Sequence, residues 1–144
     1  MKHKGCILEF TNQRNKELMK TFRKTLGEFS FIDIKKVSEV VVNSPCSRFW
    51  VSEDRAYIVI SVMMKGQYAL DSMHQYKREM FLEIFKRVQA MREENPEMPM
   101  DDIIFDVVNS PAPKFYMKPR YAMNIIYSIK KNSHSNHHHP HNVC

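Results

Sequence analysis

One five-residue segment occurs twice in this chain, and the distance between the copies limits what the chain can fold into. Residues 41–45 read Val-Val-Asn-Ser-Pro, and residues 107–111, 66 positions later, read the same. At this offset, Arg-Phe-Trp-Val at 48–51 aligns with Lys-Phe-Tyr-Met at 114–117. An internal repeat of this length indicates that one structural unit, about half the chain, is built twice. The sequence therefore predicts a tandem pair of similar units.

The composition favours helices over strands for these units. Only 3 of the 144 residues are glycine, which disfavours tight β-hairpins and glycine-rich phosphate-binding loops. The apolar fraction of 43% is enough for a hydrophobic core and argues against global disorder. We therefore expect an all-α protein.

Apolar periodicity and capping residues divide each repeat into three helices. The expected helices span residues 11–26, 33–43 and 52–65 in the first repeat, and residues 72–94, 100–109 and 118–131 in the second. The run Val40 to Val42 fits a β-strand as well as a helix, because a short apolar run does not distinguish the two.

The expected domain organisation follows from the size of the repeats. A unit of about 55 ordered residues buries too little surface to be stable alone. We therefore expect the repeats at 11–66 and 67–131 to pack together as one compact unit. Residues 1–10 are expected to form an N-terminal arm, and residues 132–144, rich in Ser, Asn and His, a disordered tail.

Charge is distributed unevenly along the chain, whose formal net charge is +6. Residues 1–26 carry seven Lys and Arg against two acids, and residues 112–131 carry five and no acid. Residues 93–106 carry six acids and no base. Such segregation favours a basic face that binds nucleic acid or an acidic partner, although solvated helix faces of a soluble protein produce a similar pattern.

Each repeat places a basic residue two positions before a large aromatic residue. Aromatic rings can stack on bases while the neighbouring cation contacts phosphate. The expected nucleic-acid-binding residues are Arg48, Trp50, Lys114, Tyr116, Lys118 and Arg120, with DNA and RNA both left open. In the alternative, structural interpretation, Phe49 and Phe115 fill a core shared by the repeats, and the Trp and Tyr cover its edge.

No catalytic motif stands out, and we expect a protein that is not an enzyme and that needs no cofactor. The histidines of the tail predict only adventitious metal binding, because a tail offers no preformed ligand geometry. They are His137, His138, His139 and His141, with His134 and Cys144 nearby. The three cysteines include no CxxC pair and no apolar run is long enough to cross a bilayer, so we expect a cytoplasmic protein with no membrane contact.

Residues 43–56 resemble a segment of small uncharacterised proteins of gut Bacteroidales and their mobile elements or phages. The resembling stretch reads Asn-Ser-Pro-Cys-Ser-Arg-Phe-Trp-Val-Ser-Glu-Asp-Arg-Ala. The resemblance implies a cellular context and no mechanism. It fits the alternative function, a protein-interaction or structural accessory module that associates with a partner protein or with itself and does not contact nucleic acid.

Overall fold

The computed structural model describes residues 4–29, 33–66 and 70–135. Within these residues the chain forms six α-helices and no β-strand, which confirms the expected all-α class. The helices are α1 (Lys4–Glu28), α2 (Ile34–Val42), α3 (Glu53–Met64), α4 (Gln75–Glu94), α5 (Met100–Val108) and α6 (Pro119–Ser135).

Several helix boundaries differ from the expected ones. Val40 to Val42 belong to α2, so the strand alternative is wrong. Helix α1 begins at Lys4 within the expected N-terminal arm, and α6 continues to Ser135 within the expected tail. No proline interrupts either extension, so the helical hydrogen bonds continue. The rest of the expected tail, residues 136–144, lies outside the described residues.

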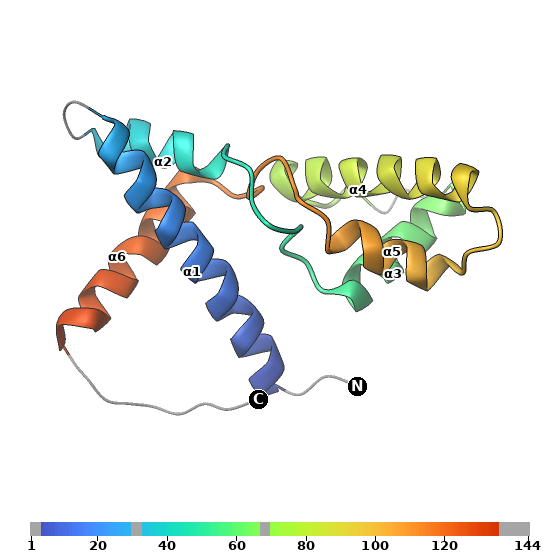
Figure 1. Cartoon of the computed structure of the whole chain (residues 1–144), viewed down its shortest axis with the longest axis horizontal. Helices are drawn as coiled ribbons and strands as arrows, with labels where there is room; N and C mark the ends of the chain where they lie inside the picture. Colours follow the sequence, from blue (N-terminus) through green and yellow to red (C-terminus); the bar gives the residue numbers. More distant parts are fainter. Residues whose placement is uncertain (1–3, 30–32, 67–69, 136–144) are drawn as a thin grey trace. The chain divides into compact units, whose positions relative to one another are not determined.

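The helices form two compact units, not the single unit that we expected. Unit 1 comprises residues 1–44 and 117–144, which hold α1, α2 and α6. Unit 2 comprises residues 45–116, which hold α3, α4 and α5 (Figure 1). Each unit therefore combines two helices from one half of the sequence with the third helix of the other half. These units differ from the expected domains at 11–66 and 67–131.

In unit 1, α2 packs against both α1 and α6, and α1 also contacts α6. Among the described side chains of these three helices, those at most 1% exposed are Leu18, Phe22, Val37, Val41, Ala122 and Ile126. The buried positions of α2 fall on one side of the helix, because apolar residues recur at intervals of three and four. Its other side remains exposed.

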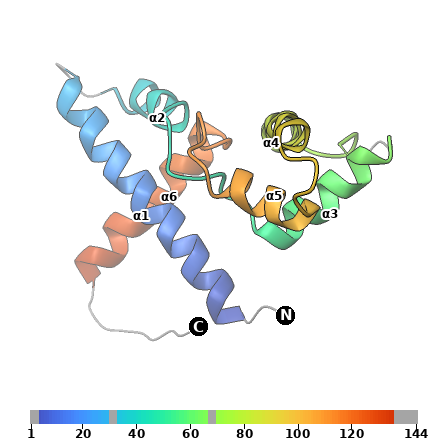
Figure 2. The same ribbon diagram turned by 45° about the vertical axis from the view of Figure 1, so that its right-hand side comes forward.

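In unit 2, α5 packs against both α3 and α4, which also contact each other (Figure 2). Phe81 and Ile84 of α4, Ile60 of α3 and Ile103 of α5 are at most 1% exposed and form its core. Phe49 and Phe115 are buried as well, but both belong to unit 2. Helix α1 belongs to unit 1.

The repeated Asn-Ser-Pro segment ends α2 and α5 in the same way. Asn43 Nδ2 and Ser44 Oγ donate to carbonyl oxygens in the last turn of α2 at 2.8 and 2.7 Å. Asn109 Nδ2 and Ser110 Oγ do so in α5 at 2.9 and 2.6 Å. These side chains add hydrogen bonds to carbonyls of the last helical turn, and in α5 the same carbonyls also accept hydrogen bonds from the backbone N–H groups of Asn109 and Ser110. The following proline cannot continue the helix.

Candidate nucleic-acid interface

The two units differ in net charge. Unit 1 contains 13 Lys and Arg and 5 Asp and Glu, a net of +8. Unit 2 contains 9 Lys and Arg and 11 Asp and Glu, a net of −2. The basic character of the chain therefore belongs to unit 1, whereas four of the six expected binding residues belong to unit 2.

The side chain of Arg48 contacts its own connector, the segment between α2 and α3, and the first residue of α3. Its Nε donates to the Phe49 carbonyl at 3.0 Å, and one terminal nitrogen donates to the Val51 carbonyl at 2.8 Å. The guanidinium also lies 3.7 Å from a carboxylate oxygen of Glu53. Burial lowers the pKa of Arg48, and the charge of Glu53 partly offsets this effect. The side chain thus holds the connector against the start of α3.

The Arg48 guanidinium also covers Trp50, the second expected residue of this connector. Its central carbon lies 5.4 Å from the centroid of the indole ring, within the range of a cation–π contact. Trp50 is half-buried, and its indole nitrogen is buried. The ring therefore already has a cation over one face, where we expected a base to stack.

The second connector, between α5 and α6, repeats this arrangement with different residues. Lys114 Nζ lies 5.6 Å from the centroid of the Tyr116 ring and 3.6 Å from a Glu79 carboxylate oxygen. The Tyr116 ring stacks on Phe49 with centroids 6.1 Å apart. Burial, helped by the negative charge of Glu83, raises the pKa of Tyr116 to about 12.

Tyr116 also has the only positive φ among the described non-glycine residues, at 58°. This left-handed conformation is unfavourable for an aromatic residue and persists only where surrounding contacts enforce it. The contacts with Phe49 and Lys114 supply that constraint. Tyr116 is the last residue of unit 2, so the constrained backbone lies where the chain leaves this unit.

Backbone hydrogen bonds bring the two connectors side by side within unit 2. Cys46 and Ala112 exchange two N–H to carbonyl bonds of 3.0 Å each. Phe49 N–H donates to the Val108 carbonyl at the end of α5 at 2.9 Å. The structure thus places the four expected residues of the connectors in the same unit, where the two connectors pack against each other. These residues are Arg48, Trp50, Lys114 and Tyr116.

The other two expected residues, Lys118 and Arg120, belong to unit 1. Both are exposed at the beginning of α6, where Pro119 occupies the first helical position. The chain contains no acidic residue after Asp106, so α6 is a helix with basic and neutral side chains only. Lys118 and Arg120 are the expected contact residues that the fold leaves accessible.

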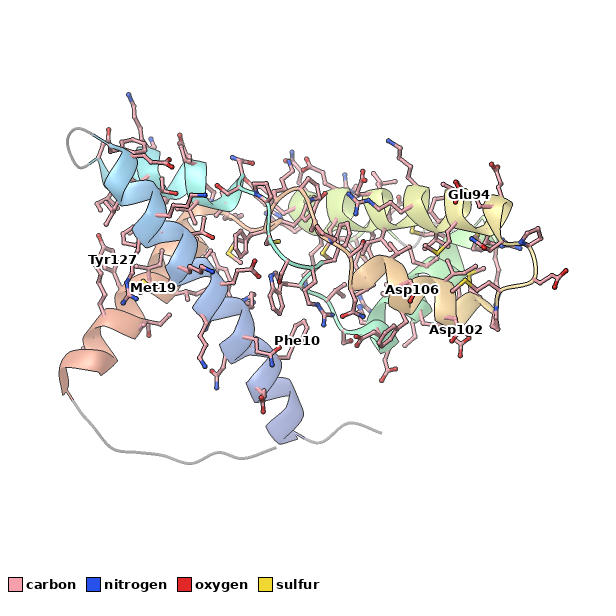
Figure 3. All side chains as sticks on the ribbon, in the orientation of Figure 1. Phe10, Met19, Glu94, Asp102, Asp106 and Tyr127 are labelled. Atoms are coloured by element: carbon pink, nitrogen blue, oxygen red, sulfur yellow. The ribbon has the colours of Figure 1, made fainter. Side chains whose placement is uncertain are left out.

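A stripe of exposed side chains on α6 was not predicted. Arg120, Asn124, Tyr127 and Lys131 follow one another at intervals of four, three and four residues and are all exposed. This spacing places them along one face of the helix. Tyr127, labelled on α6 in Figure 3, is 55% exposed. Helical spacing and the absence of acids are the sequence signals that could have revealed this face. The expected contact residues were instead chosen near the repeated motif, and of this stripe only Arg120 lies there.

Helix α1 contributes further positive charge beside α6. The Arg14 guanidinium of α1 lies 5.7 Å from the ring centroid of Tyr121 on α6. Lys130 Nζ of α6 lies 5.2 Å from the ring centroid of Phe22 on α1. Among the described side chains of α1, the exposed basic ones are Lys16, Lys20, Arg23 and Lys24. Unit 1 therefore presents basic side chains from two helices that contact each other.

Neither a metal centre nor a membrane span is found in the described part of the chain. Among those residues, no three His, Cys, Asp or Glu side chains are grouped closely enough to hold a metal ion. No helix within the same ranges combines the length and apolar character needed to cross a membrane. The four histidines expected to bind metal adventitiously, residues 137–139 and 141, fall outside the described residues. Searches of protein-family models, curated proteins and solved structures gave no match to this chain.

Proposed function

We propose that this protein binds nucleic acid without catalysing a reaction, and that the contact surface is the exposed face of α6 in unit 1. The observation that carries the proposal is the stripe Arg120, Asn124, Tyr127 and Lys131 on a helix without acidic residues. The charge of +8 on unit 1 supports it, since phosphate contacts supply most of the affinity of nucleic-acid-binding proteins.

The side chains of this stripe have complementary roles in recognising nucleic acid. Arg120 and Lys131 can each neutralise a phosphate, and Arg can also pair with a guanine edge. Asn124 can pair with an adenine edge in the major groove of DNA, which is wide enough to admit an α-helix. Tyr127 can stack on an unpaired base. The base-edge contacts of Arg120 and Asn124 suit a duplex, whereas stacking of Tyr127 suits a single strand. Binding to both forms must therefore be compared.

In this proposal the connector residues have a structural role. Arg48 holds Trp50 in place, and Lys114 holds Tyr116 in place. The two connectors pair through Cys46 and Ala112. Only Lys118 and Arg120 of the expected contact residues remain in the interface. Neutralising the connector cations should therefore lower stability more than it lowers affinity for nucleic acid.

We also infer that the chain consists of two copies of one three-helix unit that have exchanged their third helices. The N-termini of α2 and α5, the N-termini of α3 and α6, and the C-termini of α1 and α4 are each separated by 66 positions, the offset of the sequence repeat. The composition of the two compact units supports the exchange, since each combines two helices from one half of the sequence with the third helix of the other half. It leaves one unit basic and the other weakly acidic.

The test is anisotropy of labelled oligonucleotides of one sequence, single-stranded and duplex, titrated with the full chain at about 50 and about 200 mM salt. The variant R120A/K131A should bind about tenfold more weakly, and its dependence of log affinity on log salt should be shallower by about 2. Tyr127→Ala should weaken single-strand binding selectively, because stacking contributes about 1–3 kcal/mol per base.

The matched control is K77A/K86A, which removes two exposed positive charges from α4 of unit 2. Its affinity should stay close to that of the unaltered chain. The variant R48A/K114A separates the two possible interfaces. If this variant stays folded and loses more affinity than R120A/K131A, the interface lies at the connectors and the assignment to α6 is wrong.

A protein-interaction module is the alternative function, and exposed apolar side chains of unit 2 favour it. Tyr57 and Ile58 of α3, Leu82 of α4 and Phe105 of α5 are between 43% and 56% exposed. Absence of any anisotropy change at low salt, together with salt-insensitive association with a protein, would support this alternative over nucleic-acid binding.

A further inference from the structure

Helices α2 and α5 expose matching positions that carry opposite charge. On α2 the positions that face solvent are occupied by Lys35, Lys36, Glu39 and Val40. On α5 the corresponding positions, 66 residues later, are occupied by Asp101, Asp102, Phe105 and Asp106. We name these two sets the α2 face and the α5 face. Figure 3 labels Asp102 and Asp106 on α5.

The two faces are complementary in both charge and apolar character. The α2 face has two positive charges and one negative charge, and the α5 face has three negative charges. Each also exposes one large apolar side chain, Val40 at 43% and Phe105 at 54%. An apolar side chain beside charges that are mainly of one sign is the composition expected of a small interface with a partner of opposite charge.

Neither face is covered by the other helices of its own unit. Lys35, Lys36, Asp101, Asp102 and Asp106 are all exposed, and none forms an ion pair within the described residues. The buried sides of α2 and α5 already fill the cores of their own units. The two faces are therefore available to a second molecule.

We propose that the α2 face of one molecule docks on the α5 face of a second copy of this chain. Lys35 and Lys36 pair with the aspartates of the partner, and Val40 packs against the partner's Phe105. Because the two faces are different surfaces, the contact is heterologous, and each molecule has one face of each kind. Contacts of this type either close into a ring or continue head to tail.

The contact surface is small, which sets the strength of the association. A nine-residue helix is about 14 Å long, at 1.5 Å per residue. Two such helices bury less area than a stable dimer needs, so the association is transient and weak. Its ion pairs lie at the surface and are screened by salt. Association is therefore expected at high protein concentration and low salt.

The test is sedimentation velocity of the full chain, without nucleic acid, over a range of protein concentrations at low salt. The unaltered chain should show a sedimentation coefficient that rises with concentration. The variants K35D/K36D and D101K/D102K should each stay monomeric, because both faces of each variant then carry the same sign of charge. An equimolar mixture of the two variants should associate again, because every face then meets its opposite.

The control K77D/K86D makes the same charge change as K35D/K36D on α4, outside both faces, and should associate like the unaltered chain. Phe105→Ala changes no charge and should weaken association, which keeps the proposal testable if a charge reversal disturbs folding. A chain that stays monomeric at every concentration, or a mixture of the two charge-reversed variants that fails to associate while both are folded, would overturn the proposal. Because no nucleic acid is present, these outcomes are independent of the proposed function.

Discussion

Helices α2 and α5 occupy corresponding positions in the two units, and they differ mainly on the side that faces solvent. Both have nine residues, both end at Asn-Ser-Pro, and both pack against the two other helices of their unit. On the exposed side, Lys35 and Lys36 of α2 correspond to Asp101 and Asp102 of α5. Packing therefore constrains the buried side, whereas the exposed side is free to acquire a different charge.

Two buried positions also differ between the two helices, Val37 against Ile103 and Ser38 against Ile104, and the second leads to the largest expected effect. Ile104 of α5 and Ser38 of α2 are 1% and 2% exposed. Ile104→Ala should lower the free energy of unfolding by about 2–5 kcal/mol, because it removes buried methyl groups and leaves a cavity. Ser38→Ala should cost less than about 1 kcal/mol, since it removes a single hydroxyl that donates to the Lys35 carbonyl at 2.8 Å. Urea unfolding followed by circular dichroism measures both.

Val40→Ala is the control for this pair, because it truncates an exposed apolar side chain of α2 and should change stability by less than about 0.5 kcal/mol. If Ser38→Ala lowered the free energy of unfolding as much as Ile104→Ala does, the expected difference between a buried hydroxyl and a buried apolar side chain would be wrong.

The N-termini of α2 and α5 are stabilised differently, and the expected effects are smaller. Asp33 Oδ1 accepts a hydrogen bond from Lys36 N–H at 3.3 Å, whereas Pro99 before α5 offers no such bond. Asp33→Ala should cost about 1 kcal/mol through the lost cap. Asp102→Ala should cost about 0.3–1 kcal/mol through the helix dipole, and this cost should shrink as salt is raised. Urea unfolding at low and high salt distinguishes the two mechanisms.

Glu39→Ala, in the middle of α2, is the control for removing one exposed carboxylate and should have little effect at either salt concentration. Equal salt dependence for Asp33→Ala and Asp102→Ala would contradict the distinction between a hydrogen-bonded cap and a dipole interaction.

The two connectors also differ, and here an effect on stability is expected only at high pH. The folded chain raises the pKa of Tyr116 to about 12 from its ordinary value of 10.0. The unfolded chain therefore loses the phenolic proton first, and the stability contributed by the neutral phenol is lost as pH rises from 10 to about 12. Tyr116→Phe should lack this contribution, so its free energy of unfolding should fall less steeply over that pH range. Unfolding free energies measured across this pH range test the difference.

Tyr121→Phe removes one phenol from an exposed position of α6 and serves as the matched control. Its free energy of unfolding should fall with pH as steeply as that of the unaltered chain. An equally steep decline in Tyr116→Phe would show that burial in the second connector does not hold this phenol neutral.

Local sequence patterns predicted the helices well, but they did not predict the contacts of the connector side chains. Asp33 and Ser52 cap α2 and α3 as their positions indicated, because a cap depends on residues within one turn. Lys118 and Arg120 are accessible, but the contacts of Arg48 could not be predicted. Which carbonyls its guanidinium reaches depends on how the connector folds back, and no helical or strand periodicity describes that path.

The pairing of helices into units depended on packing that local patterns do not record. Helices α3 and α6 bury alanine and isoleucine at corresponding positions, Ala56 and Ile60 in one and Ala122 and Ile126 in the other. Either helix therefore has the apolar pattern needed to complete either unit. Periodicity and caps act over a few residues and were sufficient to specify six helices. The choice of partner is made by side-chain packing between segments far apart in the chain, and it separates a basic unit from an acidic one.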